Sequence, residues 1–280
     1  QNDGGAININ THDGQISDCT FARNKCNAGS GTIKCRTSNT KINKCDFIEN
    51  TVQVNGSAIF FYSIYGCQFA ECTFVKNTCK AGYGTIRFEI ANSDQNIEIY
   101  KCEFNESQGQ DIHCIDFYNS NSATINIKEC NFNDCGNNGC LIRVQSIVQQ
   151  ALLQNCSINF SKDQTAIGIF LNSDKISLIG NTFQHFKNAV VHFPCMSIDE
   201  KLEVVENSFI DCSESPIFDI KNYLKTSPTI KGNTFDNINN NYPVLRLKFE
   251  DSIDGIVFEN NTFSNFNTNN DFGGIGLEID

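Results

Sequence analysis

A short motif that returns at a nearly constant interval constrains the fold of this chain more than any other feature. It consists of Cys or Asn, then any residue, then Phe or Ile, and successive copies begin 25 to 30 residues apart. The first positions of the ten copies are Cys19, Cys45, Cys72, Cys102, Cys130, Cys156, Asn181, Asn207, Asn233 and Asn261. A fixed period in this range is typical of a solenoid, in which each repeat packs only against its neighbours.

The repeat predicts a single all-β domain. Each unit contains three short stretches of alternating apolar residues, the pattern of half-buried strands, and none has a helical period. We therefore expect a single-stranded right-handed parallel β-helix of about ten coils, with three short strands in each coil of roughly 27 residues. The repeats span residues 1–280, so one continuous β-helix is expected. Neither end carries a polar cap, which predicts a segment of a larger protein with caps outside this chain.

The third motif position is expected to point into the core and to form a column of stacked side chains. This column comprises Phe21, Phe47, Phe74, Phe104, Phe132, Phe183, Phe209, Phe235 and Phe263, with Ile158 in the sixth repeat. A second apolar column is expected at Ile33, Ile59, Ile86, Ile115, Ile142, Ile167, Leu245 and Ile275. Both columns are interpreted as core and not as a ligand groove.

The first motif position follows one strand directly and precedes the next, so it is expected at a sharp bend. Asn tolerates the left-handed backbone that such bends need, and Asn side chains stacked one coil apart can form an amide ladder. Cys cannot form that ladder, which leaves two interpretations for the first six repeats. The thiols are either small buried groups, or they bridge neighbouring coils, for example Cys19 to Cys45. We favour reduced thiols, because parallel Cβ vectors leave the Cβ atoms slightly too far apart.

The remaining cysteines and the glycosylation motifs suggest a compartment. Cys135 and Cys140 could close a small bridge within one loop, while the absence of C-x-x-C argues against zinc, and no cofactor is expected. Fifteen cysteines and five N-x-[ST] motifs together favour an extracellular or cell-surface protein. The candidate glycosylation sites are Asn55, Asn105, Asn155, Asn159 and Asn260.

Charge and hydropathy exclude two classes of partner. The net charge of −11 argues against nucleic acid, because phosphate binding needs a basic surface. No stretch approaches the roughly 18 uncharged apolar residues of a membrane span, so none is expected in this segment.

A search for catalytic residues finds no convincing set. Glycosidases need two carboxylates about 5 to 9.5 Å apart, and polysaccharide lyases use clustered acidic calcium ligands with an Arg or Lys base. The nearest candidates for such acidic ligands are Asp111 and Asp116 beside His113, and Glu250, Asp251 and Asp254 in one loop, all expected to be solvated surface charges. His12, His113, His185 and His192 have no recurring partner. The outward positions of the first strand of each coil are expected to be Lys34, Phe60, Arg87, Asp116, Arg143 and Gly168, a mixed row without a catalytic pattern.

The early repeats resemble a known family. Gly-Gly-Ala-Ile at 4–7 occurs together with Phe-x-x-Asn at 21–24, 47–50 and 74–77. This combination is similar to the repeat pair of chlamydial polymorphic outer-membrane proteins and of related β-helix surface proteins of protists. The resemblance implies a secreted β-helix of the pectin-lyase-like fold that takes part in adhesion. Pectinase-type hydrolases of that fold carry Asn-Thr-Asp, Asp-Asp and Gly-His-Gly, and none of these strings is present.

Two functional hypotheses follow. The first is a non-enzymatic extracellular structural or adhesive module, such as a rigid spacer, a surface coat or a filament component. Its partners would be other protein subunits or further β-helical coils of the same protein, and surface glycans. The alternative is a polysaccharide-active enzyme or a glycan-binding module of the pectin-lyase-like fold.

Overall fold

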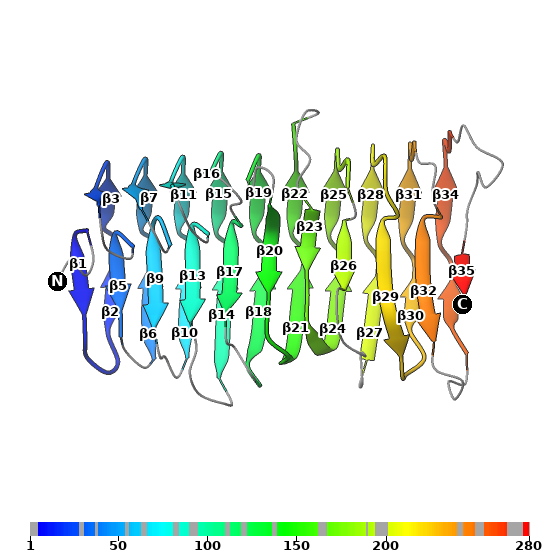
Figure 1. Ribbon diagram of the computed structural model, residues 1–280, viewed down its shortest axis with the longest axis horizontal. Helices are drawn as coiled ribbons and strands as arrows, with labels where there is room; N and C mark the ends of the chain where they lie inside the picture. Colours follow the sequence, from blue (N-terminus) through cyan, green and yellow to red (C-terminus); the bar gives the residue numbers. More distant parts are fainter. Residues whose placement is uncertain are drawn as a thin grey trace.

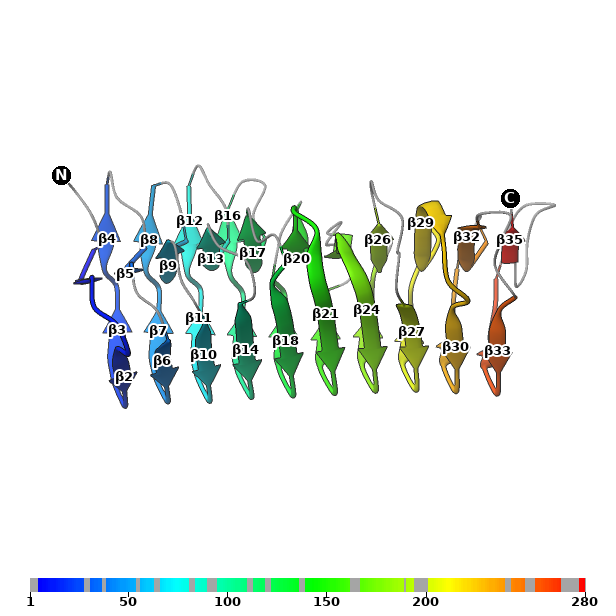
Figure 2. The same cartoon turned by 90° about the horizontal axis from the view of Figure 1, so that it is seen from below.

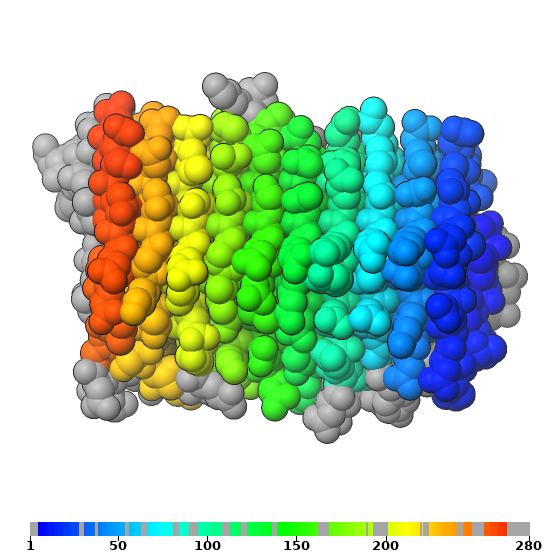
Figure 3. All heavy atoms as spheres, turned by 180° about the vertical axis from the view of Figure 1, so that it is seen from behind, coloured from blue at the N-terminus to red at the C-terminus, as the bar shows by residue number. Residues whose placement is uncertain are grey.

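In a computed structural model, the chain winds as a parallel β-helix from one end of a rod to the other (Figure 1). The structure describes residues 5–27, 31–36, 39–53, 56–62, 66–80, 84–89, 95–109, 113–118, 122–135, 139–161, 167–188, 190–193, 201–239, 243–249, 255–267 and 277–279. The predictions for Asn55, Asp111, Glu250, Asp251, Asp254 and Ile275 lie outside these residues. The predicted all-β parallel solenoid with three main strands per coil is confirmed. Seen from behind with all atoms drawn, the coils lie side by side in sequence order along the rod (Figure 3).

Three long parallel sheets, A, B and C, run the length of the rod. Sheet A contains β1 (Ile7–Ile9), β5 (Ile33–Cys35), β9 (Ile59–Tyr62), β13 (Ile86–Glu89), β17 (Ile115–Tyr118), β20 (Cys140–Val144), β23 (Ile167–Phe170), β26 (Val191–Phe193), β29 (Phe218–Leu224), β32 (Leu245–Phe249) and β35 (Leu277–Ile279). Sheet B contains β2 (Gln15–Ser17), β6 (Thr40–Asn43), β10 (Cys67–Ala70), β14 (Asn96–Tyr100), β18 (Thr124–Lys128), β21 (Val148–Gln154), β24 (Ser173–Ile179), β27 (Lys201–Val205), β30 (Thr229–Lys231) and β33 (Val257–Glu259). Sheet C contains β3 (Thr20–Ala22), β7 (Asp46–Ile48), β11 (Thr73–Val75), β15 (Glu103–Asn105), β19 (Asn131–Asn133), β22 (Ser157–Asn159), β25 (Thr182–Gln184), β28 (Ser208–Ile210), β31 (Thr234–Asp236) and β34 (Thr262–Ser264).

A fourth, shorter sheet follows sheet C in the first coils and was not predicted. Sheet D contains β4 (Lys25–Cys26), β8 (Thr51–Val52), β12 (Thr78–Cys79) and β16 (Gln108–Gly109). Figure 2 shows these strands beyond the ends of sheet C, at the N-terminal end of the rod. Strands of two residues carry too little alternation to be recognised from sequence.

The motif aromatic rings stack in register along sheet C. Neighbouring rings from Phe21 to Phe132, and from Phe183 to Phe263, lie 4.7 to 5.1 Å apart between centroids and 5 to 13° from parallel. Ile158 separates the two runs. A second stack in sheet A joins Phe61, Phe88 and Phe117, which the sequence analysis missed. Aromatic rings at strand spacing thus fill much of the core.

The second apolar column needs two corrections. Ile142 pairs with Ile169, whereas Ile167 pairs with Cys140, so Ile169 and not Ile167 belongs to this column. At the C-terminal end Leu245 pairs with Leu277. When the pairing of two strands shifts by two residues, the same side chains still face the core. The alternating pattern of apolar residues alone therefore cannot detect such a shift.

Two sharp corners flank sheet C, and both use residues with left-handed backbone. Corner 1, between sheets B and C, has φ between 50° and 66° at Asp18, Lys44, Glu71, Lys101, Glu129, Asn155, Gly180, Glu206, Gly232 and Asn260. Corner 2, after sheet C, has φ between 48° and 61° at Arg23, Glu49, Lys76, Glu106, Asp134, His185, Asp211, Asn237 and Asn265. The prediction that the motif Asn itself is left-handed is therefore wrong. The residue before it turns the chain, and the motif residue then points inward.

The motif Asn residues of corner 1 form a continuous hydrogen-bonded ladder. The Asn181 side-chain Nδ2 and the Asn181 backbone N–H both donate to Oδ1 of Asn207, at 2.9 Å each. The same pair of bonds links Asn207 to Asn233 and Asn233 to Asn261. Each Nδ2 also donates to a carbonyl of the preceding coil, for example Asn207 to Leu178 at 2.8 Å. These buried amides satisfy backbone groups that the corner removes from the sheets.

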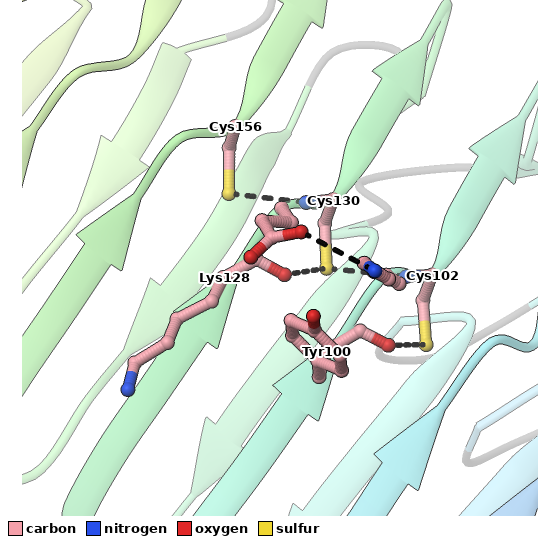
Figure 4. Close-up of polar contacts among 7 residues, drawn as sticks. Tyr100, Cys102, Lys128, Cys130 and Cys156 are labelled. Atoms are coloured by element: carbon pink, nitrogen blue, oxygen red, sulfur yellow. Dashed lines mark hydrogen bonds and ion pairs between the residues drawn. The ribbon is translucent and has the colours of Figure 1, made fainter.

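The cysteines of corner 1 form no amide ladder, but weaker thiol contacts link some of their coils. The Cys130 thiol donates to the Lys128 carbonyl at 3.3 Å, and its sulfur accepts the Cys102 N–H at 3.5 Å. Figure 4 shows these contacts together with that of Cys102 to Tyr100. At the junction between the two halves, the Cys156 N–H donates to Oδ1 of Asn181 at 2.9 Å.

A second asparagine ladder lies at corner 2, where the first coils carry Phe-x-x-Asn. Nδ2 of Asn24 donates to Oδ1 of Asn50, and Nδ2 of Asn50 donates to Oδ1 of Asn77, at 2.9 Å each. Asn50 and Asn77 also donate to the carbonyls of Phe21 and Phe47. The amide ladder therefore lies at corner 2 in the first coils and at corner 1 from Asn181 onward, and the coils of Cys102 and Cys130 between them have sulfur contacts at corner 1.

No disulfide joins any of the fourteen cysteines in the described part of the chain. The bridges considered between Cys19 and Cys45 and between Cys135 and Cys140 are not formed. Cys19 is exposed, while the other motif cysteines are buried.

Asn207→Ala tests the ladder. It should lower the free energy of unfolding by about 3 kcal/mol or more, because buried partners on both neighbouring coils lose their hydrogen bonds. Urea denaturation measures the loss. Ser208→Ala in the same strand points outward and is the control, expected within about 0.5 kcal/mol of wild type. Equal small losses in both variants would contradict this account.

The buried thiols predict a loss of stability in alkali. Burial raises the pKa of Cys212 to about 12, from 9.0. The folded state therefore keeps a proton that the unfolded chain releases, so this contribution is complete below pH 9 and is lost as pH rises towards 12. Between these limits, the free energy of unfolding of wild type should fall by about 1.4 kcal/mol per pH unit more than that of Cys212→Ala. Ser213→Ala is the control and should keep the wild-type slope. Parallel stability curves for wild type and Cys212→Ala would refute the assignment.

Candidate binding face

The outward side of sheet A, here called the A face, combines cations with aromatic rings. One outward row follows the strand register from coil to coil: Lys34, Phe60, Arg87, Asp116, Arg143, Phe170, His192, Asp219 and Arg246. The prediction that Gly168 follows Arg143 in this row is wrong, since Arg143 pairs with Phe170. This is the same two-residue shift that misplaced Ile167.

Arginine is concentrated on this face. The chain has 32 acidic residues and 21 lysines and arginines, of which only five are arginine. Three of these arginines, Arg87, Arg143 and Arg246, lie in the outward row, and Arg36 follows β5 beside it. Arginine has a planar fork of donors that suits carboxylate and sulfate groups. Four of the five arginines in a chain of net charge −11 thus lie on or beside this face, with Arg36 exposed and Arg87 buried.

The centre of the row is a buried ionic cluster from three consecutive coils. The Arg143 Nε donates to Oδ1 of Asp116 at 2.8 Å, and Nη1 of Arg87 lies 3.5 Å from Oδ2 of the same carboxylate. The Asp116 side chain is fully buried, and those of Arg87 and Arg143 are 6% and 13% exposed. Two guanidinium groups on one carboxylate leave a net positive charge, which is costly unless the pairing is maintained.

Aromatic rings hold several of the cations in place. The Arg87 guanidinium lies 4.8 Å from the centre of the Tyr118 ring, and Arg36 lies 5.5 Å from that of Tyr62. Contacts of this kind contribute about 0.5–1 kcal/mol at exposed sites. Arg36 is exposed and Tyr62 is 41% exposed, so this pair is accessible to a partner. Arg36, Tyr62 and Tyr118 lie two residues after Lys34, Phe60 and Asp116, so strand alternation places them on the same side. A second predicted row, two residues further along each strand, would have included them.

The titratable groups beside the ionic cluster are held in structural contacts. The Asp116 carboxylate is enclosed by its two arginines. His113 is buried, and its Nδ1 accepts the backbone N–H of Cys140 at 3.0 Å. Burial raises the pKa of the Cys140 thiol to about 12, which keeps it protonated at neutral pH.

The other predicted polar residues lie apart from this cluster. His192 is in the outward row, with its ring 5.7 Å from that of Phe170. His185 is at corner 2, where Nδ1 lies 2.9 Å from Oδ1 of Asn159 and Nε2 lies 3.3 Å from Asp211. His12 is exposed.

The glycosylation motifs fall into two structural groups. Asn155 and Asn260 are exposed at left-handed positions of corner 1. Asn105 and Asn159 are half-buried on the outside of sheet C, and their Oδ1 atoms contact Asn133 and His185, respectively.

Neither a metal-binding group nor a membrane helix is found in the part of the chain that the structure describes. No three His, Cys, Asp or Glu side chains there converge on a common point suited to a metal ion. The same residues include no helix with the length and hydropathy needed to cross a membrane.

Removing the shared carboxylate tests the ionic cluster. Asp116→Ala should cost about 3–5 kcal/mol in the free energy of unfolding, because it leaves two buried guanidinium groups without their counter-ion. The triple variant Arg87→Met, Asp116→Leu, Arg143→Met removes all three charges and should be much closer to wild type. Chemical denaturation distinguishes the two. A triple variant less stable than Asp116→Ala would contradict the assignment.

Comparison with known proteins adds no family to this description. No protein-family model matches the sequence, and no curated protein matches it. The resemblance to polymorphic outer-membrane protein repeats rests on the short motifs alone. The structure gives one of them a physical role, since the Asn of each Phe-x-x-Asn belongs to the corner 2 ladder.

Proposed function

We propose that this chain is a rigid, non-enzymatic adhesive module of an extracellular or cell-surface protein, which engages an anionic partner through the A face. The observation that carries the proposal is the concentration of arginines and aromatic rings on one side of an otherwise acidic rod. The continuous core and ladders support a spacer role, because each coil is fixed to the next by stacked rings and buried hydrogen bonds.

The chemistry of the A face favours carboxylate or sulfate groups on a short chain. Arg36 and Tyr62 offer a bidentate donor and a ring at the surface, and the ionic cluster in the next coils along the same face adds positive charge. The net charge of −11 repels a long polyanion that extends beyond this face. An acidic glycan segment matches both conditions.

The extracellular assignment and the finer classification belong to the same proposal. The Gly-Gly-Ala-Ile and Phe-x-x-Asn motifs support a right-handed, pectin-lyase-like β-helix of the polymorphic outer-membrane protein type. The exposed Asn155 and Asn260 are positions where a glycan would extend into solvent without displacing core side chains. Burial of most cysteines would protect their thiols in an oxidising compartment.

An enzyme is less well supported than a binding module. A glycosidase needs two available carboxylates, and Asp116 is committed to two arginines. Further β-helical coils or other subunits remain natural partners along the rod axis, because a terminal coil presents unpaired strand groups.

Binding to short acidic oligosaccharides tests the proposal. The chain should bind tetragalacturonate or a sulfated maltotetraose at low salt, should bind neutral maltotetraose far more weakly, and should lose affinity as salt screens the charges. Arg36→Ala with Tyr62→Ala should weaken binding about tenfold or more, whereas Lys101→Ala at corner 1 should not change it. Calorimetry measures each affinity. Absence of binding to both acidic oligosaccharides, or unchanged affinity in the double variant, would overturn the proposal.

A further inference from the structure

A polar groove lies on a different face of the rod, where the chain enters the first strands of sheet B. It has a volume of about 600 Å³ and crosses β2, β6, β10 and β14. Its walls include the outward residues Lys41, Gln68 and Glu98, which pair in register from coil to coil. Four parallel strands span about 14 Å along the axis, so the groove suits an elongated ligand.

A glycine creates the floor of this groove. Gly66 occupies the position that Asn39 and Asn96 hold in the neighbouring coils. Each of the three directly precedes one of the residues Cys67, Thr40 and Ile97, which pair with one another between strands of sheet B. Its φ of 131° is strained for other residues, and a Cβ there would lie 3.3 Å from the Asn96 carbonyl oxygen and 3.6 Å from Oδ1 of Asn39. The missing side chain therefore leaves an opening between the backbone carbonyl of Asn96 and the side-chain amide of Asn39, and Oδ1 of Asn39 faces this opening.

Hydrogen bonds between coils orient the polar groups around this opening. Nδ2 of Asn39 donates to Oδ1 of Asp13, and Nε2 of Gln68 donates to Oε2 of Glu98, at 3.0 Å each. Each primary amide has a second N–H, and each carboxylate has a second oxygen. The groove thus presents alternating donors and acceptors that are already held in place, which lowers the entropic cost of binding.

The composition of the groove selects a class of ligand. Among the described residues, its charged groups are Asp13, Glu98 and Lys41, so their local charge disfavours an anion. None of the described lining residues is aromatic, which disfavours a flat apolar ligand. Hydroxyl groups, which both donate and accept, match alternating amide and carboxylate groups.

We infer that this groove is a binding site for a neutral oligosaccharide, separate from the A face and from its anionic partner. The sugar hydroxyls donate to Asn39 Oδ1 and to the carboxylates of Asp13 and Glu98, and they accept from Gln68 and Lys41. The chain would then hold two glycans of different charge on two faces of one rod.

Titration with neutral hexasaccharides, using cellohexaose, mannohexaose and chitohexaose as probes, tests the inference. At least one should bind at millimolar concentration, with amide NMR shifts centred on β6 and β10 and little dependence on salt. Gln68→Ala should weaken that binding by about three- to tenfold, as expected for the loss of one or two hydrogen bonds. Lys41→Ala should give a smaller loss in the same direction.

A matched control lies in the same row of sheet B. Ser177 donates to Oε2 of Glu203 at 3.0 Å, the same kind of coil-to-coil bond, but outside the groove. Ser177→Ala should leave binding unchanged, and far-ultraviolet circular dichroism confirms folding of each variant. No binding of any probe, equal affinity in Gln68→Ala and Ser177→Ala, or shifts centred on the A face would each overturn the inference. Binding of acidic oligosaccharides at the A face is measured separately, so either site can fail alone.

Discussion

The structure depends on how each coil satisfies its backbone where the chain turns a sharp corner. At corners 1 and 2 a left-handed residue directs the next residue inward, and that residue's N–H and side chain must find partners in the interior. The asparagine ladders provide them, with one amide oxygen accepting two donors from the preceding coil. Because the left-handed corner recurs from coil to coil, with Asn or Cys following it at corner 1, the aromatic stacks of sheet C and the outward rows of sheets A and B remain in register.

The two ladders hold the two ends of the rod, and the described residues of the coils between them form neither amide ladder. Corner 2 has the amide ladder from Asn24 to Asn77, and corner 1 has it from Asn181 to Asn261. In the coils where corner 1 has Cys, weaker sulfur contacts replace it. In the first coils, charges alternate in sign on the outside of these corners, as in the ion pairs Lys101–Glu129 and Lys76–Glu106. Ion pairs whose side chains are half exposed add little stability. However, because the signs alternate, pairing a coil with the coil one repeat beyond its proper neighbour would place like charges together.

Part of this architecture could be predicted from sequence. The motif period identified the β-helix, and the inward Phe and the stacking of Asn181 and its equivalents followed from it. The left-handed positions were missed because Lys101 or Glu129 carries no local signal for that conformation, which Gly and Asn usually mark. The ladder from Asn24 to Asn77 was seen only as a family motif. The A face was described as a mixed row, because the meeting of Arg87, Asp116 and Arg143 depends on exact register between residues 27 to 29 positions apart.

Both proposed binding sites rely on a rod whose coils do not shift, so the corner ladders are the central claim. Native-state amide hydrogen exchange tests it most directly. The backbone N–H groups of Asn181 and Asn207, which bond to an amide oxygen at 2.9 Å, should be protected to the level of the adjacent sheet C strands. Those of Cys102 and Cys130, which bond to sulfur at 3.5 Å, should show weaker protection. Exchange at Asn181 and Asn207 as fast as in exposed turns would contradict the account.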